Sequence, residues 1–101
     1  MKVIDHAPQW WFLFADNDDL ILDVNCNHSF IGYTFTICLD DAERKMYRAQ
    51  GRDYIDTLAR AIHDSVPILE KSNSIYKGRH IGNEFQDEAL VAIQEWRALN
   101  T

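Results

Sequence analysis

Residues 9–39 read QWWFLFADNDDLILDVNCNHSFIGYTFTICL, and this stretch decides the fold. It contains three apolar runs separated by two short polar breaks, a pattern typical of a three-stranded antiparallel meander. The last run gives the clearest signal, because apolar residues at its odd positions alternate with small or polar residues at its even positions. The expected strands are about 9–15, 20–26 and 29–39.

Side-chain parity predicts how the second and third strands pair. In residues 20–26 every even position is apolar, whereas the odd positions hold Ile21 with two polar residues, so the even face is expected to join the odd face of the next strand. A two-residue turn at Asn27 and His28 achieves this by setting Val24 against Ile31. A turn one residue longer would reverse every side chain and bury the wrong set.

The first strand carries three large aromatic residues that need a cover. A short polar turn that opposes Ala15 to Leu20 leaves Trp10, Phe12 and Phe14 on the second face of the sheet. We expect a helix, the N-terminal segment or a second subunit to cover them. A homo-oligomeric module that pairs through these three residues is an alternative.

A helix is expected over about 41–50. Asp40 lies three residues before Glu43, which is the spacing of a capping box, and Gly51 is a natural C-terminal stop. The helix is short and weakly amphipathic. Its expected core-facing side chains are Ala42, Met46 and Ala49.

Two more helices are expected, over about 52–64 and 83–99. Both carry an apolar stripe at helical spacing, made of Ile55, Leu58, Ala59 and Ile62 in the first and of Phe85, Ala89, Ala92, Ile93 and Trp96 in the second. Between them, residues 65–82 keep no period. The order of elements predicts a single α+β domain over 1–101, with the three helices packed on one face of the meander.

The composition is that of an acidic globular protein. The chain has 101 residues and a formal net charge of −6, and its first 40 residues carry six acids against one lysine. A direct nucleic-acid partner is therefore not expected, because phosphate binding requires a basic surface, whereas a basic protein would be complementary. The N-terminus lacks the apolar region of a secretory signal, and no run is long enough for a membrane helix. A soluble, cytoplasmic protein is the expectation.

Metal, cofactor and thiol chemistry are not indicated. Residues 16–19 begin like a calcium loop, but Ile21 and Asn27 stand where such a loop needs glycine and glutamate. Cys26 and Cys38 lack zinc-ligand spacing and are expected on opposite faces, too far apart for a disulfide. We expect no metal, no cofactor and two separate thiols.

No catalytic motif is present, so the protein is not expected to be an enzyme. The four histidines lie in separate segments, without a nucleophile motif or a glycine-rich phosphate loop beside them. A small enzyme that uses His28 or His80 together with Arg79 is an alternative that spacing does not favour. Arg79 lies with Lys77 in the segment without a period, where either could contact an acidic group.

Packing and turn residues along most of the chain carry a family resemblance. They are Trp10-Trp11, Leu22-Asp23-Val24-Asn25-Cys26, the aromatic strand to Leu39, Glu43 with Tyr47 and Gly51, Tyr54-Ile55, Leu58-Ala59 and Glu95-Trp96-Arg97. With them the chain resembles small immunity proteins of bacterial polymorphic toxin systems, including contact-dependent growth inhibition. The resemblance implies a cytosolic, non-catalytic protein that binds and neutralises the C-terminal domain of a toxin, often a nuclease. These proteins share no binding motif, so no binding residue is carried over.

Two acidic clusters are the expected partner-binding residues. The first lies at the first turn, and the second lies at the start of the last helix, where acids also suit the positive end of the helix dipole. The members are Asp16, Asp18 and Asp19 in the first cluster and Glu84, Asp87 and Glu88 in the second. Acids at these positions would complement a basic nuclease domain.

Overall fold

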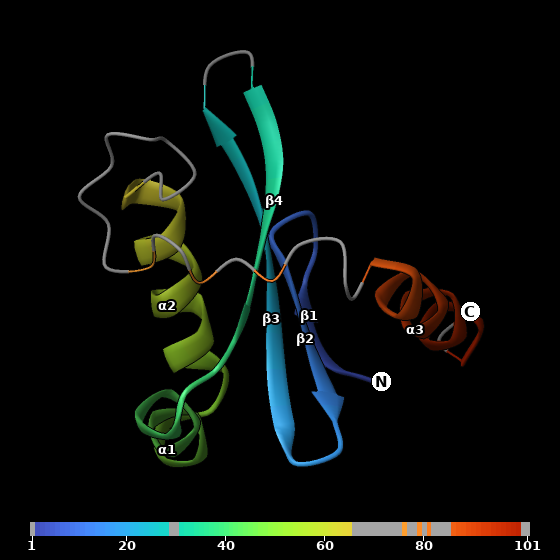
Figure 1. The fold of residues 1–101 in the computed structure, drawn as a ribbon, viewed down its shortest axis with the longest axis horizontal. Coiled ribbons are helices and arrows are strands. Elements are labelled where there is room, and N and C mark those ends of the chain that lie inside the picture. Colours follow the sequence, from blue (N-terminus) through green and yellow to red (C-terminus); the bar gives the residue numbers. More distant parts are fainter. Residues whose placement is uncertain are drawn as a thin grey trace.

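The computed structural model of the protein describes residues 2–28, 31–65, 76, 79, 81 and 86–99 (Figure 1). Its order of elements confirms the α+β class and adds a strand at the N-terminus. The elements are β1 (Lys2–Ala7), β2 (Trp11–Asp16), β3 (Asp19–His28), β4 (Ile31–Cys38), α1 (Asp41–Gln50), α2 (Arg52–Ser65) and α3 (Gln86–Leu99). The strands form one antiparallel sheet in the order β1-β2-β3-β4. The sheet is therefore a four-stranded meander, and the prediction of three strands is wrong in number.

Strand β1 could not be recognised from alternating apolar and polar residues, because a β-bulge interrupts it. Its pairing with β2 shifts register between Val3 and Asp5. Val3 and Ala7 are both buried and both odd-numbered, yet they belong to different clusters of the core. One extra residue in a strand sends the residues after it to the other face, so no single period runs through 2–7.

The first predicted hairpin has the predicted register. Ala15 pairs with Leu20, and Trp11 pairs with Val24. Asn17 adopts a positive φ of 55°, a conformation that asparagine tolerates better than most residues, and this allows the tight turn between β2 and β3.

The second hairpin keeps the predicted faces but not the predicted turn. Asn27 and His28 belong to β3, the ladder ends at the pair His28 and Ile31, and Val24 faces Phe35 instead of Ile31. The shift is four residues, and an even shift returns every side chain to the same face. The alternation of side chains excludes only registers that differ from the predicted one by an odd number of residues. The observed register differs by an even number, and its ladder extends to His28.

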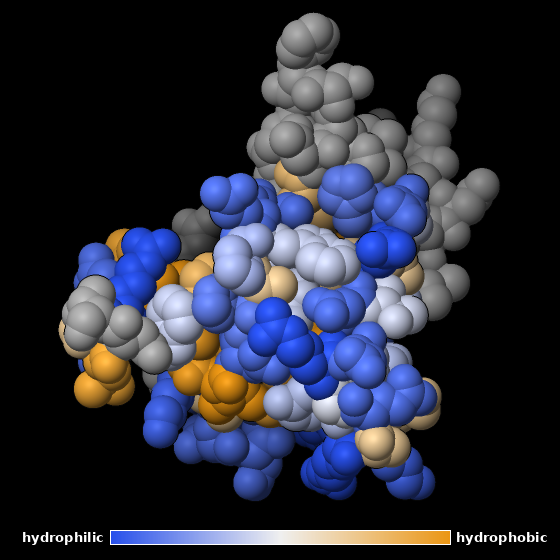
Figure 2. All heavy atoms as spheres, turned by 180° about the vertical axis from the view of Figure 1, so that it is seen from behind, coloured by the Kyte–Doolittle hydropathy of each residue, from blue (hydrophilic) through white to orange (hydrophobic). Residues whose placement is uncertain are grey.

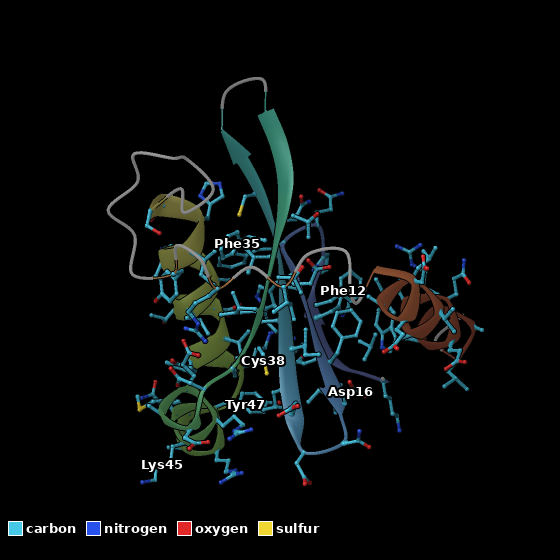
Figure 3. All side chains as sticks on the ribbon, viewed as in Figure 1. Phe12, Asp16, Phe35, Cys38, Lys45 and Tyr47 are labelled. Carbon is cyan, nitrogen blue, oxygen red and sulfur yellow. The ribbon has the colours of Figure 1, made fainter. Side chains whose placement is uncertain are left out.

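Helices cover both faces of the sheet, so the prediction that all three pack on one face is wrong. One core cluster joins Leu13 of β2 to Ile55 and Ile62 of α2, while a second joins Phe14 to Ala92 of α3. Figure 3 shows the same division, with Phe12 directed toward α3 and Phe35 toward α2. Leu13 and Phe14 are both 0 % exposed. A strand that is apolar on both sides needs a cover on each, and α3 supplies the second one.

The aromatic residues of the first strand divide between the two faces. Phe12 and Phe14 lie under α3, where Trp96 meets the Phe12 ring edge-on at 5.9 Å between centroids. This confirms that a helix covers them. Trp10 instead packs against the α2-side core, with the Arg60 guanidinium 5.9 Å from its ring, so its predicted position was wrong. Trp10 lies in the turn before β2, where Gln9 has a φ of 62° and the strand alternation does not apply.

Helix α1 has the predicted caps, but it presents a different side to the core from the one predicted. Asp40 and Glu43 form a capping box, and the Gly51 N–H donates to the Tyr47 carbonyl at 2.6 Å. The side chains toward the core are Glu43 and Tyr47, whereas the three expected ones, Ala42, Met46 and Ala49, are exposed. The periodicity of apolar residues predicted the wrong inward side for this helix, because its principal inward contact is the ion pair between Glu43 and Arg79. In α2 the predicted stripe of four residues is buried.

Candidate functional site

The acids of the first turn lie beside α1 and are partly neutralised there. Asp18 and Asp19 are exposed, and Asp16 is half-buried. Arg44 of α1 reaches across with its Nη1, 3.4 Å from both the Asp18 carbonyl and an Asp19 carboxylate oxygen, and its Nη2 pairs with Asp41. A cation already placed among these acids reduces the negative potential that they present to a partner.

The acids of α3 form a separate surface. Asp87, Glu88 and Glu95 are exposed and surround Val91, which is itself 52 % exposed, in an open surface hollow of about 480 Å³. None of these three acids forms an ion pair with a residue that the structure describes. Figure 2 shows hydrophobic and strongly hydrophilic side chains next to one another on this helix, at the left of that view. We call Asp87, Glu88, Val91 and Glu95 the acidic face of α3.

The structure does not unite the five described members of the two predicted acidic clusters into one site. The first turn is held to α1, which lies on the α2 side of the sheet, whereas α3 covers the opposite side (Figure 1). Glu84 lies outside the described residues. A single rigid partner surface therefore meets one cluster more readily than both, and the uncompensated cluster is the acidic face of α3.

A further acid, Asp23, was not among the predicted site residues. It lies in β3 on the α3 side of the sheet, and the Thr36 hydroxyl donates to its carboxylate at 3.0 Å. Burial raises the pKa of Asp23 from 3.8 to about 6, and this effect outweighs the lowering by the hydrogen bond from Thr36. A signal existed in the sequence, because Asp23 interrupts an apolar strand and faces the same side as Phe12.

The pKa of Asp23 predicts how stability depends on pH. The folded state binds this proton more tightly than the unfolded chain, so the stabilisation is present below pH 4 and is lost as the pH rises through about 6. Ionised Asp23 should cost about 3 kcal/mol at pH 7 by this linkage. Asp23→Asn is therefore expected to raise the free energy of unfolding by about 1–2 kcal/mol at pH 7.5, since the amide must still find partners.

Denaturant unfolding at pH 7.5 and pH 4 measures this effect. The gain from Asp23→Asn should disappear at pH 4, where the wild-type carboxyl is already protonated in the fold. Asp53→Asn changes an exposed acid on α2 and serves as the control. Equal differences at the two pH values, or a destabilised asparagine variant at pH 7.5, would contradict the assignment.

Arg79 is engaged within the chain. Its guanidinium forms a two-pronged ion pair with Glu43, at 2.9 Å and 2.6 Å, and also donates to the Cys38 carbonyl at 2.8 Å. Burial, then the charge of Glu43, raises the pKa of the nearby Tyr54 and Tyr76 hydroxyls. Burial, followed by the charge of Asp19, also raises the pKa of the Cys38 thiol, so the thiolate is disfavoured.

The surroundings of Arg79 and of the two cysteines can be compared with the roles that the sequence predicted for them. Arg79 does contact an acidic group, but that group is Glu43 of the same chain. The histidines proposed to act with Arg79 cannot be placed around it, because His80 and the side chain of His28 lie outside the described residues. Cys26 is buried on the α2 side. Cys38 is the strand partner of Ile21, whose side chain lies on the α3 side, so the two thiols, neither of them in a disulfide, lie on opposite faces as predicted.

The described residues define the class of protein. It is an α+β protein whose antiparallel sheet carries helices on both faces, with an acidic helix on one side. Within this part of the chain, no three side chains of metal-binding type gather closely enough to hold an ion. None of its helices has the length and apolar character needed to cross a membrane. Comparison with protein-family models, with curated proteins and with solved structures finds no match.

Proposed function

We propose that this protein is a cytoplasmic immunity protein, which binds the basic C-terminal domain of a bacterial toxin and neutralises it by one-to-one, non-covalent inhibition. The acidic face of α3 carries the proposal. Asp87, Glu88 and Glu95 have no cationic partner among the described residues, and they surround an exposed valine. An apolar centre within a charged rim is the composition of a protein-binding surface.

Electrostatics supports a basic partner. Three acids on one side of a helix, in a chain of net charge −6, attract a positively charged domain and accelerate its encounter with this face. Short-range contacts around Val91 would then set the lifetime of the complex. Nuclease domains of toxins bind phosphate and are therefore basic, so they meet this requirement.

The structure favours neither of the two alternatives. Phe12 and Phe14 are covered by α3, so pairing of two chains through them would require that helix to leave the sheet. Arg79 is held by Glu43 and the Cys38 carbonyl, which leaves its guanidinium little capacity for a substrate. We therefore retain binding as the proposed activity.

The decisive experiment uses the protein encoded in the neighbouring reading frame. Its C-terminal domain should halt growth when expressed alone, and co-expression of this chain should restore growth. The purified chain should abolish the activity of the purified domain at one molar equivalent. Growth arrest that persists despite soluble expression of both proteins, with no complex on gel filtration, would refute the proposal.

A further inference from the structure

A small hollow lies between the sheet, the turn before β2 and α3. It has a volume of about 250 Å³. Its lining combines apolar and polar residues and consists of Gln9, Trp10, Trp11, Phe12, Asp23, Asn25, Thr34 and Ile93. Pockets for drug-sized ligands begin at roughly 300 Å³, so this hollow suits a single side chain.

Asp23 gives the hollow its charge. Among the residues that the structure describes, its carboxylate accepts one hydrogen bond, from Thr36, although two oxygens can accept about four. No cationic side chain among the described residues pairs with it. A half-buried carboxylate without a cation is costly to the fold, which indicates that a cation arrives from outside.

The described groups around Asp23 do not neutralise its carboxylate. The neighbouring strands present Phe12 and Thr36 to it, and α3 contributes Ile93 to the hollow. The titratable group of β1 on this face, His6, stacks on Phe12 and meets Trp96 edge-on, with 5.4 Å and 4.3 Å between the ring centroids. On the far side, Arg60 of α2 rests against Trp10 but does not alter the pKa of Asp23.

We propose that this hollow receives the guanidinium of an arginine side chain, which the basic partner inserts between Phe12 and Ile93 to pair with Asp23. Guanidinium fits better than ammonium for two reasons. It is planar and weakly hydrated, so it packs against aromatic walls, and its five donors can serve Asp23 together with the oxygens of Asn25 and Thr34. This inference rests on the proposed function, because it names the chemistry of the partner.

The test uses a small probe and does not require the partner. N-acetyl-arginine N-methylamide is titrated into the intact protein at pH 7.5, and the methyl signals of Thr36 and Ile93 are followed by NMR. We expect saturable shifts at millimolar concentrations. N-acetyl-citrulline N-methylamide, which has nearly the same shape without the charge, should bind at least tenfold more weakly. Asp23→Asn should remove the preference for the arginine probe.

A change of pH gives a second readout on wild-type protein. At pH 5 about one in ten Asp23 carboxyls would be ionised, so the arginine probe should bind roughly tenfold more weakly than at pH 7.5. Equal binding of the two probes to the wild-type protein, or an undiminished arginine preference in Asp23→Asn, would overturn the proposal. Neither outcome depends on whether the chain inhibits a toxin, so the two proposals fail separately.

Discussion

Replacing Glu43 by alanine is expected to lower the free energy of unfolding by about 3 kcal/mol, because it leaves the Arg79 guanidinium without its counter-ion. The Glu43 side chain is only 10 % exposed and accepts both hydrogen bonds from the Arg79 guanidinium. It also accepts a hydrogen bond from the Asp40 N–H, at 2.9 Å, so the substitution opens the capping box as well. Arg79 is less deeply buried, which places the estimate at the low end of the range for buried pairs.

A double-mutant cycle separates the ion pair from the rest of this effect. Glu43→Met and Arg79→Met should each be strongly destabilising, whereas the combined variant should lose less than the sum, because neither charge is then left alone. Glu88→Ala removes the same kind of residue from an exposed position in the first turn of α3 and should lower the free energy of unfolding by less than about 1 kcal/mol. Urea unfolding curves measure all four variants. Additive losses across the cycle would show that Glu43 and Arg79 contribute independently.

The same ion pair shows why part of the fold could not be predicted from the sequence. Glu43 and Arg79 are 36 residues apart, and no local pattern links them. The inward side of α1 is set by this long-range contact, so a search for apolar periodicity selected Ala42 and Met46 instead. Local patterns succeeded where burial is purely apolar, as in α2, whose stripe around Ile55 was predicted correctly.

The sheet shows a second limit of sequence patterns. Alternation predicted the faces of β3 and β4, but an even shift leaves those faces unchanged, so the pairing of Val24 with Phe35 could not be chosen. A bulge hid β1. The apolar residues on both sides of β2 indicated that a second cover was needed, and Phe14 buried beneath α3 shows where it lies. The interruption of an apolar strand marked Asp23 in the sequence, but its position in a hollow could not be predicted, because the hollow is formed jointly by β2, β3, β4 and α3.

Reversing charge on the acidic face of α3 is expected to weaken partner binding by about 100-fold at low salt. Glu88→Lys combined with Glu95→Lys turns attraction of a basic domain into repulsion around Val91, and like charges across an interface carry a large cost. Both residues are exposed, so the fold should be retained. The loss should shrink as salt is added, because exposed charges are screened over about 10 Å at 0.1 M ionic strength.

A matched control has the same change in net charge. Asp53→Lys combined with Asp64→Lys alters two exposed acids on α2, which lies on the opposite side of the sheet from α3. This variant should bind within about threefold of the wild type, the effect expected from net charge alone. Equal losses in both variants would indicate long-range attraction without a defined docking face.

The most direct test of the central claim is a calorimetric titration of the C-terminal domain from the neighbouring reading frame with three proteins: the wild type, the α3 variant and the α2 control. We predict one-to-one binding for all three at low salt, with an affinity about 100-fold weaker in the α3 variant alone and a reduced salt dependence for that variant. Binding that is absent in the wild type, or identical in the wild type and the α3 variant at every salt concentration, would contradict the account.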